Sequence, residues 1–321
     1  MRSALLWMVS ALGLMVIPDV SCGKEGFSAG TAANRATVSV INGTPLRVNV
    51  GSDHSFQVFN AEVPGSGQMY PNASELADFG WMLRVGNTLY TPDFNTRPTA
   101  TSGLGNTVNY TQTGVSAVTG NGSAAAPFTV TVTGSAGPGL NLTQVVSYVN
   151  GENFYRKELT IGNVGATTAA IRVFLGADIF LASSDSGRSL HVPSSGAAGG
   201  STCAEVSPIY NILLIPLSTP APTAYTADSF SAVWAQIASG TLPSTTNPAS
   251  CFDNGAALQW NLDIPAGGTA AIRAATSFGA IPNIAQPPVV AAPVPGLNAL
   301  GVAVLLGFTV LSGAFVWRRT V

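Results

Sequence analysis

The chain has 321 residues, of which only 9% are charged, and its formal net charge is −2. This length accommodates one large β domain or two small domains. Without the terminal segments, 10 basic residues (13 less Arg2, Arg318 and Arg319) and 14 acidic residues (15 less Asp19) remain, so the charge is −4. The sequence contains no basic cluster, which argues against nucleic acid as a partner.

The amino terminus has the pattern of a secretory signal peptide. One positive charge, at Arg2, precedes an apolar stretch over residues 4–17 that ends at Pro18. Such a stretch is too short for an ordinary membrane span and suits a signal sequence. We expect residues 1–22 to be removed; the alternative is that Cys22 is retained and carries a lipid.

From residue 36 onward, short runs of alternating apolar and polar residues are separated by turn residues, which is typical of β-strands. The clearest hairpin signal is the pair of runs 37–41 and 46–50 on either side of Asn42-Gly43. Similar runs recur as far as residue 278, and 231–237 is one of them. No helix of ordinary length is expected.

Strand runs without intervening helices favour sheets that pack face to face. We therefore predict an all-β fold: one large antiparallel β-sandwich over residues 36–282, with a supersandwich-like arrangement as one form of it. Two smaller sandwiches that divide near residues 134–139 are the alternative. Residues 23–35 are small and polar, and we expect a flexible lead-in there.

The cysteines predict one disulfide. Removal of Cys22 with the signal peptide leaves Cys203 and Cys251 as an even pair in an oxidising compartment. A bond between them would close a loop of about 48 residues and stabilise the fold by about 4 kcal/mol in the chain-entropy model. Two unpaired buried thiols are the alternative.

The two histidines, His54 and His191, give a weak signal for a site. His-x-His and His-x-x-x-His pairs are absent, so neither histidine has the local spacing of a metal site. Each is expected in a loop or at the surface. We predict no metal and no cofactor.

Asp178 and Asp185 form the most distinctive polar group. Asp178 comes late in a long apolar run, where burying a carboxylate is costly without a partner. Residues 183–187, Ser-Ser-Asp-Ser-Gly, offer oxygens for a turn or for a weak calcium site, although the Asp-x-Asp-x-Asp-Gly pattern is missing. Turn chemistry is the simpler interpretation; a carboxylate pair also suits glycoside hydrolysis at the required separation.

The aromatic residues allow two interpretations, a sugar-stacking surface or a sandwich core, and the core is favoured. They are Trp81, Trp234, Trp260, Tyr70, Tyr90 and Tyr155. The sequence has no phosphate-binding Gly loop, no Gly-x-Ser-x-Gly elbow and no Cys/His nucleophile arrangement. No catalytic residue is assigned, and an enzyme is the less favoured class.

The carboxyl terminus combines a Pro-rich spacer (residues 283–296), an uncharged apolar run (297–317) and a basic end (318–321). At about 1.5 Å per residue, the apolar run would span roughly 31 Å as a helix, which matches the hydrocarbon core of a bilayer. Arg318 and Arg319 favour a cytoplasmic end, which leaves the β domain outside.

Val294-Pro295-Gly296, the apolar run and Arg318-Arg319 together resemble the sorting tails of the bacterial PEP-CTERM and IPTL-CTERM families. The resemblance covers the last 28 residues, and the motif lacks the Glu of the PEP form and the Thr-Leu of the IPTL form. It implies recognition by an exosortase-type membrane enzyme that cuts at the Pro-containing motif and passes the protein to the cell surface. A plain single-span anchor is the alternative.

The sequence thus predicts an exported protein of the cell envelope or cell surface, anchored by a single pass before any processing. A structural or adhesive, matrix-associated role is the main hypothesis. A carbohydrate-binding or carbohydrate-active sandwich, of glycosidase or mutarotase type, is the alternative. The expected partners are the membrane, an exosortase-type enzyme and extracellular polysaccharide.

Overall fold

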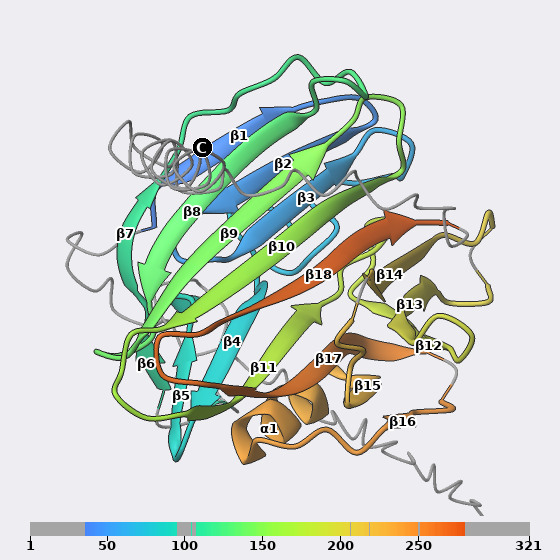
Figure 1. Ribbon diagram of the computed structural model, residues 1–321. Coiled ribbons are helices and arrows are strands. Elements are labelled where there is room, and N and C mark those ends of the chain that lie inside the picture. The colour runs from blue at the N-terminus through green and yellow to red at the C-terminus, as the bar shows by residue number, and fades with distance from the viewer. Residues whose placement is uncertain are drawn as a thin grey trace, which may run out of the picture. The chain divides into compact units, whose positions relative to one another are not determined.

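The computed structural model describes residues 36–94, 104, 107–205, 207–217, 219–249 and 251–279 (Figure 1). Most of them form β-strands, which confirms the predicted all-β class. No helix in these ranges is long and apolar enough to cross a membrane. The signal peptide, the lead-in, the predicted span 297–317 and the sorting motif lie outside the described residues.

Eighteen strands and one helix make up the described part of the chain. The strands are β1 (Val38–Asn42), β2 (Leu46–Gly51), β3 (Phe56–Asn60), β4 (Phe79–Val85), β5 (Thr88–Thr91), β6 (Thr107–Asn109), β7 (Thr111–Val115), β8 (Phe128–Ser135), β9 (Leu140–Tyr148), β10 (Phe154–Asn163), β11 (Ala169–Asp178), β12 (Ser186–Val192), β13 (Ala197–Thr202), β14 (Asn211–Pro216), β15 (Ala224–Ser229), β16 (Thr245–Thr246), β17 (Phe252–Ile264) and β18 (Thr269–Phe278). The helix is α1 (Phe230–Ser239).

Fifteen of the strands form one continuous sheet in the order β6-β5-β4-β11-β17-β12-β13-β14-β18-β10-β9-β8-β7, with β15 and β16 beside β17. Neighbouring strands are antiparallel, apart from the short parallel pairs β5–β6 and β15–β16. The joint between β17 and β12 consists of two residue pairs, Ser186 with Asp253 and Gly187 with Phe252.

This sheet curls almost into a barrel, because long twisted strands coil as the sheet grows. Its two halves face each other across one apolar core, in which Trp81 and Leu175 of one half share a cluster with Leu159 and Ile161 of the other. The prediction of a two-sheet sandwich is therefore correct for the facing layers and wrong for the connectivity, since both layers belong to one sheet. The alternative division at 134–139 is also wrong, because β8 and β9 pair directly across that turn.

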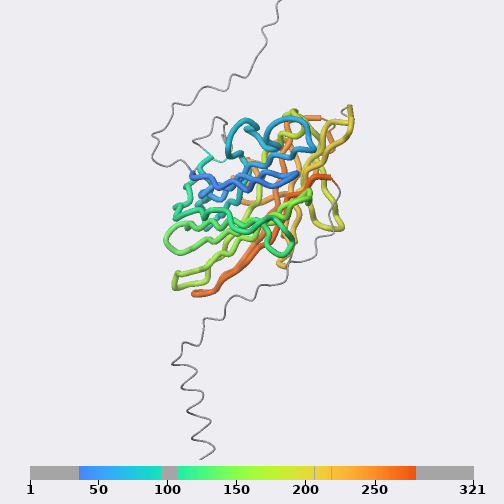
Figure 2. The backbone as a smooth tube through the Cα atoms, turned by 90° about the horizontal axis from the view of Figure 1, so that it is seen from above, coloured from blue at the N-terminus to red at the C-terminus, as the bar shows by residue number. Residues whose placement is uncertain are grey.

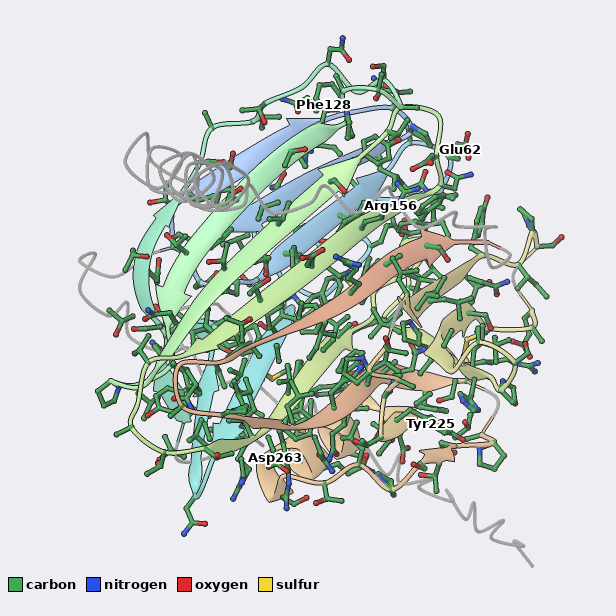
Figure 3. All side chains as sticks on the ribbon, in the orientation of Figure 1. Glu62, Phe128, Arg156, Tyr225 and Asp263 are labelled. Atoms are coloured by element: carbon green, nitrogen blue, oxygen red, sulfur yellow. A yellow bond between two sulfur atoms is a disulfide. The ribbon has the colours of Figure 1, made fainter. Side chains whose placement is uncertain are left out.

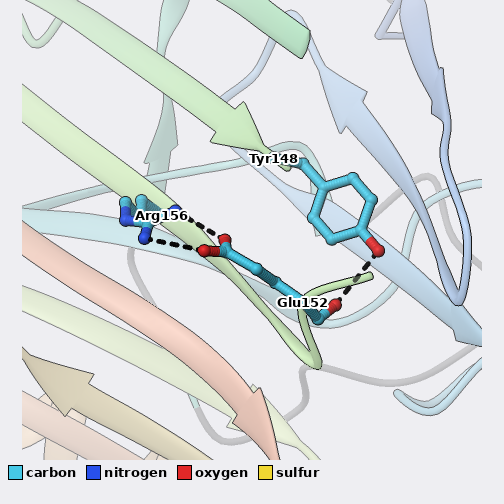
Figure 4. A network of polar contacts seen from close by, with 3 residues as sticks. All are labelled: Tyr148, Glu152 and Arg156. Carbon is cyan, nitrogen blue, oxygen red and sulfur yellow. Dashed lines mark hydrogen bonds and ion pairs between the residues drawn. The ribbon is translucent and has the colours of Figure 1, made fainter. Parts of the chain in front are cut away.

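A separate three-stranded sheet, β1-β2-β3, covers the core behind β8–β10 in Figure 1 and lies as a blue layer beside them in Figure 2. The predicted β1–β2 hairpin is present, with Ile41 opposite Val48. Tyr148 ties this sheet to the β9–β10 turn (Figure 4). Its hydroxyl accepts a hydrogen bond from the Leu46 amide (3.2 Å) and donates one to the Glu152 carbonyl (3.0 Å).

Helix α1 replaces the strand that was predicted over 231–237. Ser229 caps its first turn by accepting a hydrogen bond from the Ala232 amide, and Gly240 ends it in the left-handed conformation at φ 85°. Its buried residues Val233, Trp234 and Ile237 form a second apolar cluster with the outer face of β4 and β11. The period of this apolar face is helical, and it provides the burial that stabilises a ten-residue helix.

The predicted disulfide between Cys203 and Cys251 is present, with the two Cα atoms 5.4 Å apart. Cys203 directly follows β13, and Cys251 directly precedes β17. The bond therefore lies next to the two-pair joint between β12 and β17.

Candidate functional site

An open cleft of about 450 Å³ lies where β4, β11 and β17 run side by side. It is lined by Arg84, Gly86, Asn87, Ala170, Ile171, Arg172, Asn261, Leu262 and Asp263. Asp263, near the end of β17, is labelled in Figure 3. Most of the lining side chains carry hydrogen-bonding groups, and most of those groups are exposed.

Strand register brings these polar residues together. Arg172 on β11 lies opposite Arg84 on β4 and opposite Asn261 on β17, so the three form a row across the sheet. Asp263 lies opposite Ala170, one step further along the same face. Asn87 comes from the tight turn between β4 and β5. The row therefore depends on pairings between segments that are distant in the sequence.

The end of α1 fixes both arginines. Nη1 of Arg84 donates to the carbonyl oxygen of Ala238 (2.7 Å), and Nη1 of Arg172 donates to that of Gly240 (2.8 Å). The last carbonyl groups of a helix carry a partial negative charge and lack partners within the helix. Each guanidinium thus satisfies one of these carbonyls and keeps most of its five N–H groups for other acceptors.

These two arginines differ from others in the described part of the chain. Arg156 forms a bidentate ion pair with Glu152, and Arg273 pairs with Glu158 (Figure 4 shows the first pair). Among the described residues, neither Arg84 nor Arg172 has a carboxylate partner. The cleft therefore holds two positive charges on directly opposed strand positions, an arrangement that is unfavourable without an anion.

Asn261 adds a directed hydrogen-bond donor. Its Oδ1 accepts a hydrogen bond from Nε2 of Gln259 (2.7 Å), and Oε1 of Gln259 accepts one from the Leu242 amide (2.8 Å). This series of hydrogen bonds fixes the Asn261 side-chain amide so that its N–H groups remain for other acceptors. Together with the Asp263 carboxylate, the cleft offers donors and acceptors of the kind that bind closely spaced hydroxyl groups.

The structure brings Asp178 and Asp185 together and adds Asp253, which the sequence did not single out. One carboxylate oxygen from each of the three lies within 4.8 Å of the other two. Asp178 is buried at the end of β11, and the other two are partly exposed. Carboxylate oxygens at this spacing are the donors that hard cations such as calcium prefer, so these three residues are the candidate metal ligands.

His54 lies in the turn between β2 and β3, in agreement with the expected loop position, and it is fully buried there. Its ring contacts that of Tyr110 edge to face, with the centroids 5.2 Å apart. Burial lowers the pKa of His54 to about 4, although the neighbouring Asp53 charge and Gln144 act in the opposite direction. His54 is therefore neutral at physiological pH.

His191 lies on β12, where its ring stacks on that of Tyr225 with the centroids 3.6 Å apart. Partial burial lowers the pKa of His191. Tyr225, labelled in Figure 3, also lines a groove of about 600 Å³ together with Pro193, Pro216 and Pro222. His54 and His191 lie in separate surroundings, one inside the core and one beside this groove.

The core interpretation of the aromatic residues is confirmed for Trp81, Trp234, Trp260 and Tyr155, which are at most 1% exposed. The rings of Trp81 and Trp260 pack against each other with centroids 5.8 Å apart. These side chains cannot stack on a sugar. Tyr70 and Tyr90 are half-buried and lie outside the lining of the cleft.

Lys157 is a buried group that the sequence did not indicate. It is 1% exposed, its ammonium nitrogen lies 4.5 to 5.2 Å from the ring centroids of Phe56, Phe79 and Tyr155, and it donates to the Thr276 hydroxyl. Burial holds the pKa of Lys157 well below its usual value. Its pairing position, between β9 and β18, places it deep in the core.

No protein-family model and no curated protein sequence matches the chain. Among solved structures, it is similar to a putative kojibiose phosphorylase from the human microbiome (6% identity, TM-score 0.36, covering 76% of this chain and 25% of that one). It is also similar to a bacterial glucoamylase complexed with acarbose (6%, TM-score 0.46, 79% and 33%) and to a putative aldose 1-epimerase from Escherichia coli K12 (9%, TM-score 0.39, 77% and 100%).

The chain thus spans between a quarter and a third of the length of the first two of these proteins. At such identities and TM-scores, the activities of these proteins do not transfer to this chain. Its function has to be inferred from its own residues.

Proposed function

We propose that the β domain is a non-catalytic polysaccharide-binding domain of an exported surface protein. The observation that carries the proposal is the cleft on β4, β11 and β17, where Arg84, Arg172, Asn87, Asn261 and Asp263 converge. Planar amide, carboxylate and guanidinium groups form paired hydrogen bonds with adjacent hydroxyls, which saccharides offer at high density. The cleft is open, so it suits an internal segment of a long chain.

Binding is favoured over hydrolysis because of the number of carboxylates that line the cleft. A typical glycosidase places two carboxyl groups on either side of the scissile bond. Asp263 is the only carboxylate among the described residues that line the cleft. The cluster of Asp178, Asp185 and Asp253 is not part of this lining.

Export and surface sorting form the second part of the proposal. We propose that residues 1–22 direct export and that Val294-Pro295-Gly296, residues 297–317 and Arg318-Arg319 form a sorting signal for an exosortase-type enzyme. The disulfide between Cys203 and Cys251 supports an oxidising compartment. A polysaccharide-binding domain at the cell surface would provide the adhesive, matrix-associated role.

Two measurements test these parts separately. Mass analysis of the mature protein from its native host is expected to show a chain that begins near Gly23 and lacks residues 297–321. An intact carboxyl terminus in the mature chain would contradict sorting by cleavage, and a plain anchor would then hold.

For the binding activity, calorimetric titration of the full chain with a panel of soluble polysaccharides is expected to find at least one ligand. Asn261→Ala should weaken binding of that ligand by roughly tenfold, the equivalent of one or two hydrogen bonds. Asn141→Ala is the matched control, because Asn141 is an exposed amide on β9, away from the cleft. Equal affinities of the two variants would refute the assignment of this cleft.

A further inference from the structure

The charge inside the cleft indicates which saccharides it binds. Arg84 and Arg172 are register partners on adjacent antiparallel strands, and both side chains line the cleft. Directly opposed like charges destabilise a sheet, so such a pair needs compensation. Asp263 lines the same cleft but forms no ion pair with either arginine.

The end of α1 provides only part of this compensation. Its carbonyl oxygens accept one N–H group from each arginine, and the helix terminus carries about half a negative charge against two positive ones. With the Asp263 carboxylate also counted, about half a unit of positive charge remains in the cleft. One monovalent anion between the two guanidinium groups would offset the repulsion between them.

Gly240 helps to hold the two arginine side chains in position before a ligand binds. Its left-handed backbone, at φ 85°, places the carbonyl against Arg172 and leaves no room for a side chain. A Cβ atom at this position would lie 2.7 Å from Cδ of Arg84 and 3.1 Å from Nη1 of Arg172. The two side chains are thus packed against the backbone of the helix end, which reduces the entropy that they lose on binding an anion.

We propose that the cleft binds an acidic saccharide, with a uronate carboxylate held between Arg84 and Arg172. This inference rests on the proposed polysaccharide-binding function and adds the class of the ligand. Guanidinium groups bind carboxylates through paired, charge-assisted hydrogen bonds, which adds direction to the attraction. Asn87, Asn261 and Asp263 then contact the hydroxyl groups of the same sugar or of its neighbours.

The test compares two ligands that share one sugar backbone and differ in whether the carboxyl groups are charged. The full chain is titrated with polygalacturonate and with fully methyl-esterified polygalacturonate, in which every carboxylate is replaced by a neutral methyl ester. We expect the acid form to bind at least tenfold more tightly, and its affinity to fall with ionic strength. Dextran sulfate distinguishes carboxylate from sulfate, because a preference for dextran sulfate over polygalacturonate would overturn the uronate assignment.

Three variants test whether the preference for the acid form depends on the two arginines of the cleft. Arg84→Gln and Arg172→Gln should each weaken polygalacturonate binding by roughly tenfold to a hundredfold, while binding of the esterified form changes little. Arg47→Gln, with the same charge change at an exposed position over the ring of Phe59, should have no effect beyond a small shift. Melting temperatures of the variants verify that each has folded.

The possible results distinguish a failure of the inference about ligand charge from a failure of the proposed polysaccharide-binding function. If both forms bind equally and the arginine variants behave like Arg47→Gln, the two arginines hold no carboxylate and the inference about charge is wrong. If neither form nor any neutral polysaccharide binds, the proposed function fails as well.

Discussion

The buried imidazole of His54 makes the stability of this protein sensitive to mild acid. Its pKa in the folded state, about 4, is lower than the value of 6.5 that it takes when unfolded. The folded state therefore favours the neutral ring, and its contribution to stability is fully present above pH 6.5 and is lost as the pH falls towards 4. Protonation of His54 alone should lower the free energy of unfolding by about 2 kcal/mol at pH 5 and about 3 kcal/mol at pH 4.

His54→Asn isolates this effect, because asparagine tolerates the positive φ of 67° at this position. Denaturant unfolding of the wild type and the variant, followed by tryptophan fluorescence at pH 7.5, 6, 5 and 4, gives the difference at each pH. We expect the variant to be less stable at pH 7.5, because it loses the packing against Tyr110, and to approach the wild type as the pH falls. His191→Asn, at a partly exposed position, should retain most of the acid-dependent loss.

The result that would contradict this reasoning is a parallel decline. If the wild type and His54→Asn lose stability equally between pH 7.5 and pH 4, within about 0.5 kcal/mol, the acid sensitivity arises from carboxylates and not from His54.

Four further changes probe the fold and the cleft. Lys157→Met should raise the melting temperature at pH 7. In the wild type, the free energy of unfolding should increase with pH up to the unfolded pKa of 10.5, because burial favours neutral Lys157, and the variant should lose this increase. An unchanged pH profile would contradict a depressed pKa. Tyr148→Phe should cost about 1–3 kcal/mol in denaturant unfolding, because the Leu46 amide and the Glu152 carbonyl lose their partner; a neutral effect would mean that water replaces the hydroxyl. Replacing both Cys203 and Cys251 with serine should cost up to about 4 kcal/mol, and reduction of the wild type should reproduce this loss. Gly240→Ala should destabilise by about 1–2 kcal/mol and also weaken saccharide binding, whereas loss of stability with unchanged binding would show that the arginines do not need this helix end.

Much of the strand pattern was accessible from sequence, because local signals determine it. Asn42-Gly43 between two alternating runs correctly marked the first hairpin. Residues 231–237 were wrongly predicted as a strand, because Val233, Ala235 and Ile237 alternate as in a strand. The contact of Trp234 on the helix with the ring of Phe94 appears only in the folded structure. Over seven residues, the hydrophobic periodicity alone does not distinguish a strand from a helix.

The cleft was much harder to predict, because it depends on the register between distant segments. Arg84 and Arg172 each appear in the sequence as a single charge inside an apolar run, and that was the available signal. Their pairing follows from the alignment of β4 with β11, which no local pattern specifies. The same applies to Asp253, which joins Asp178 only through the alignment of β17 beside β11.

The joint between β12 and β17 has a mechanical consequence. It joins two parts of the continuous sheet by only two residue pairs, so it adds few backbone hydrogen bonds against a pulling force. The covalent bond between Cys203 and Cys251 crosses next to this joint and cannot be sheared at forces that break hydrogen bonds. Under load, the bond would therefore keep the end of β13 attached to the start of β17 after the hydrogen bonds of the joint had broken.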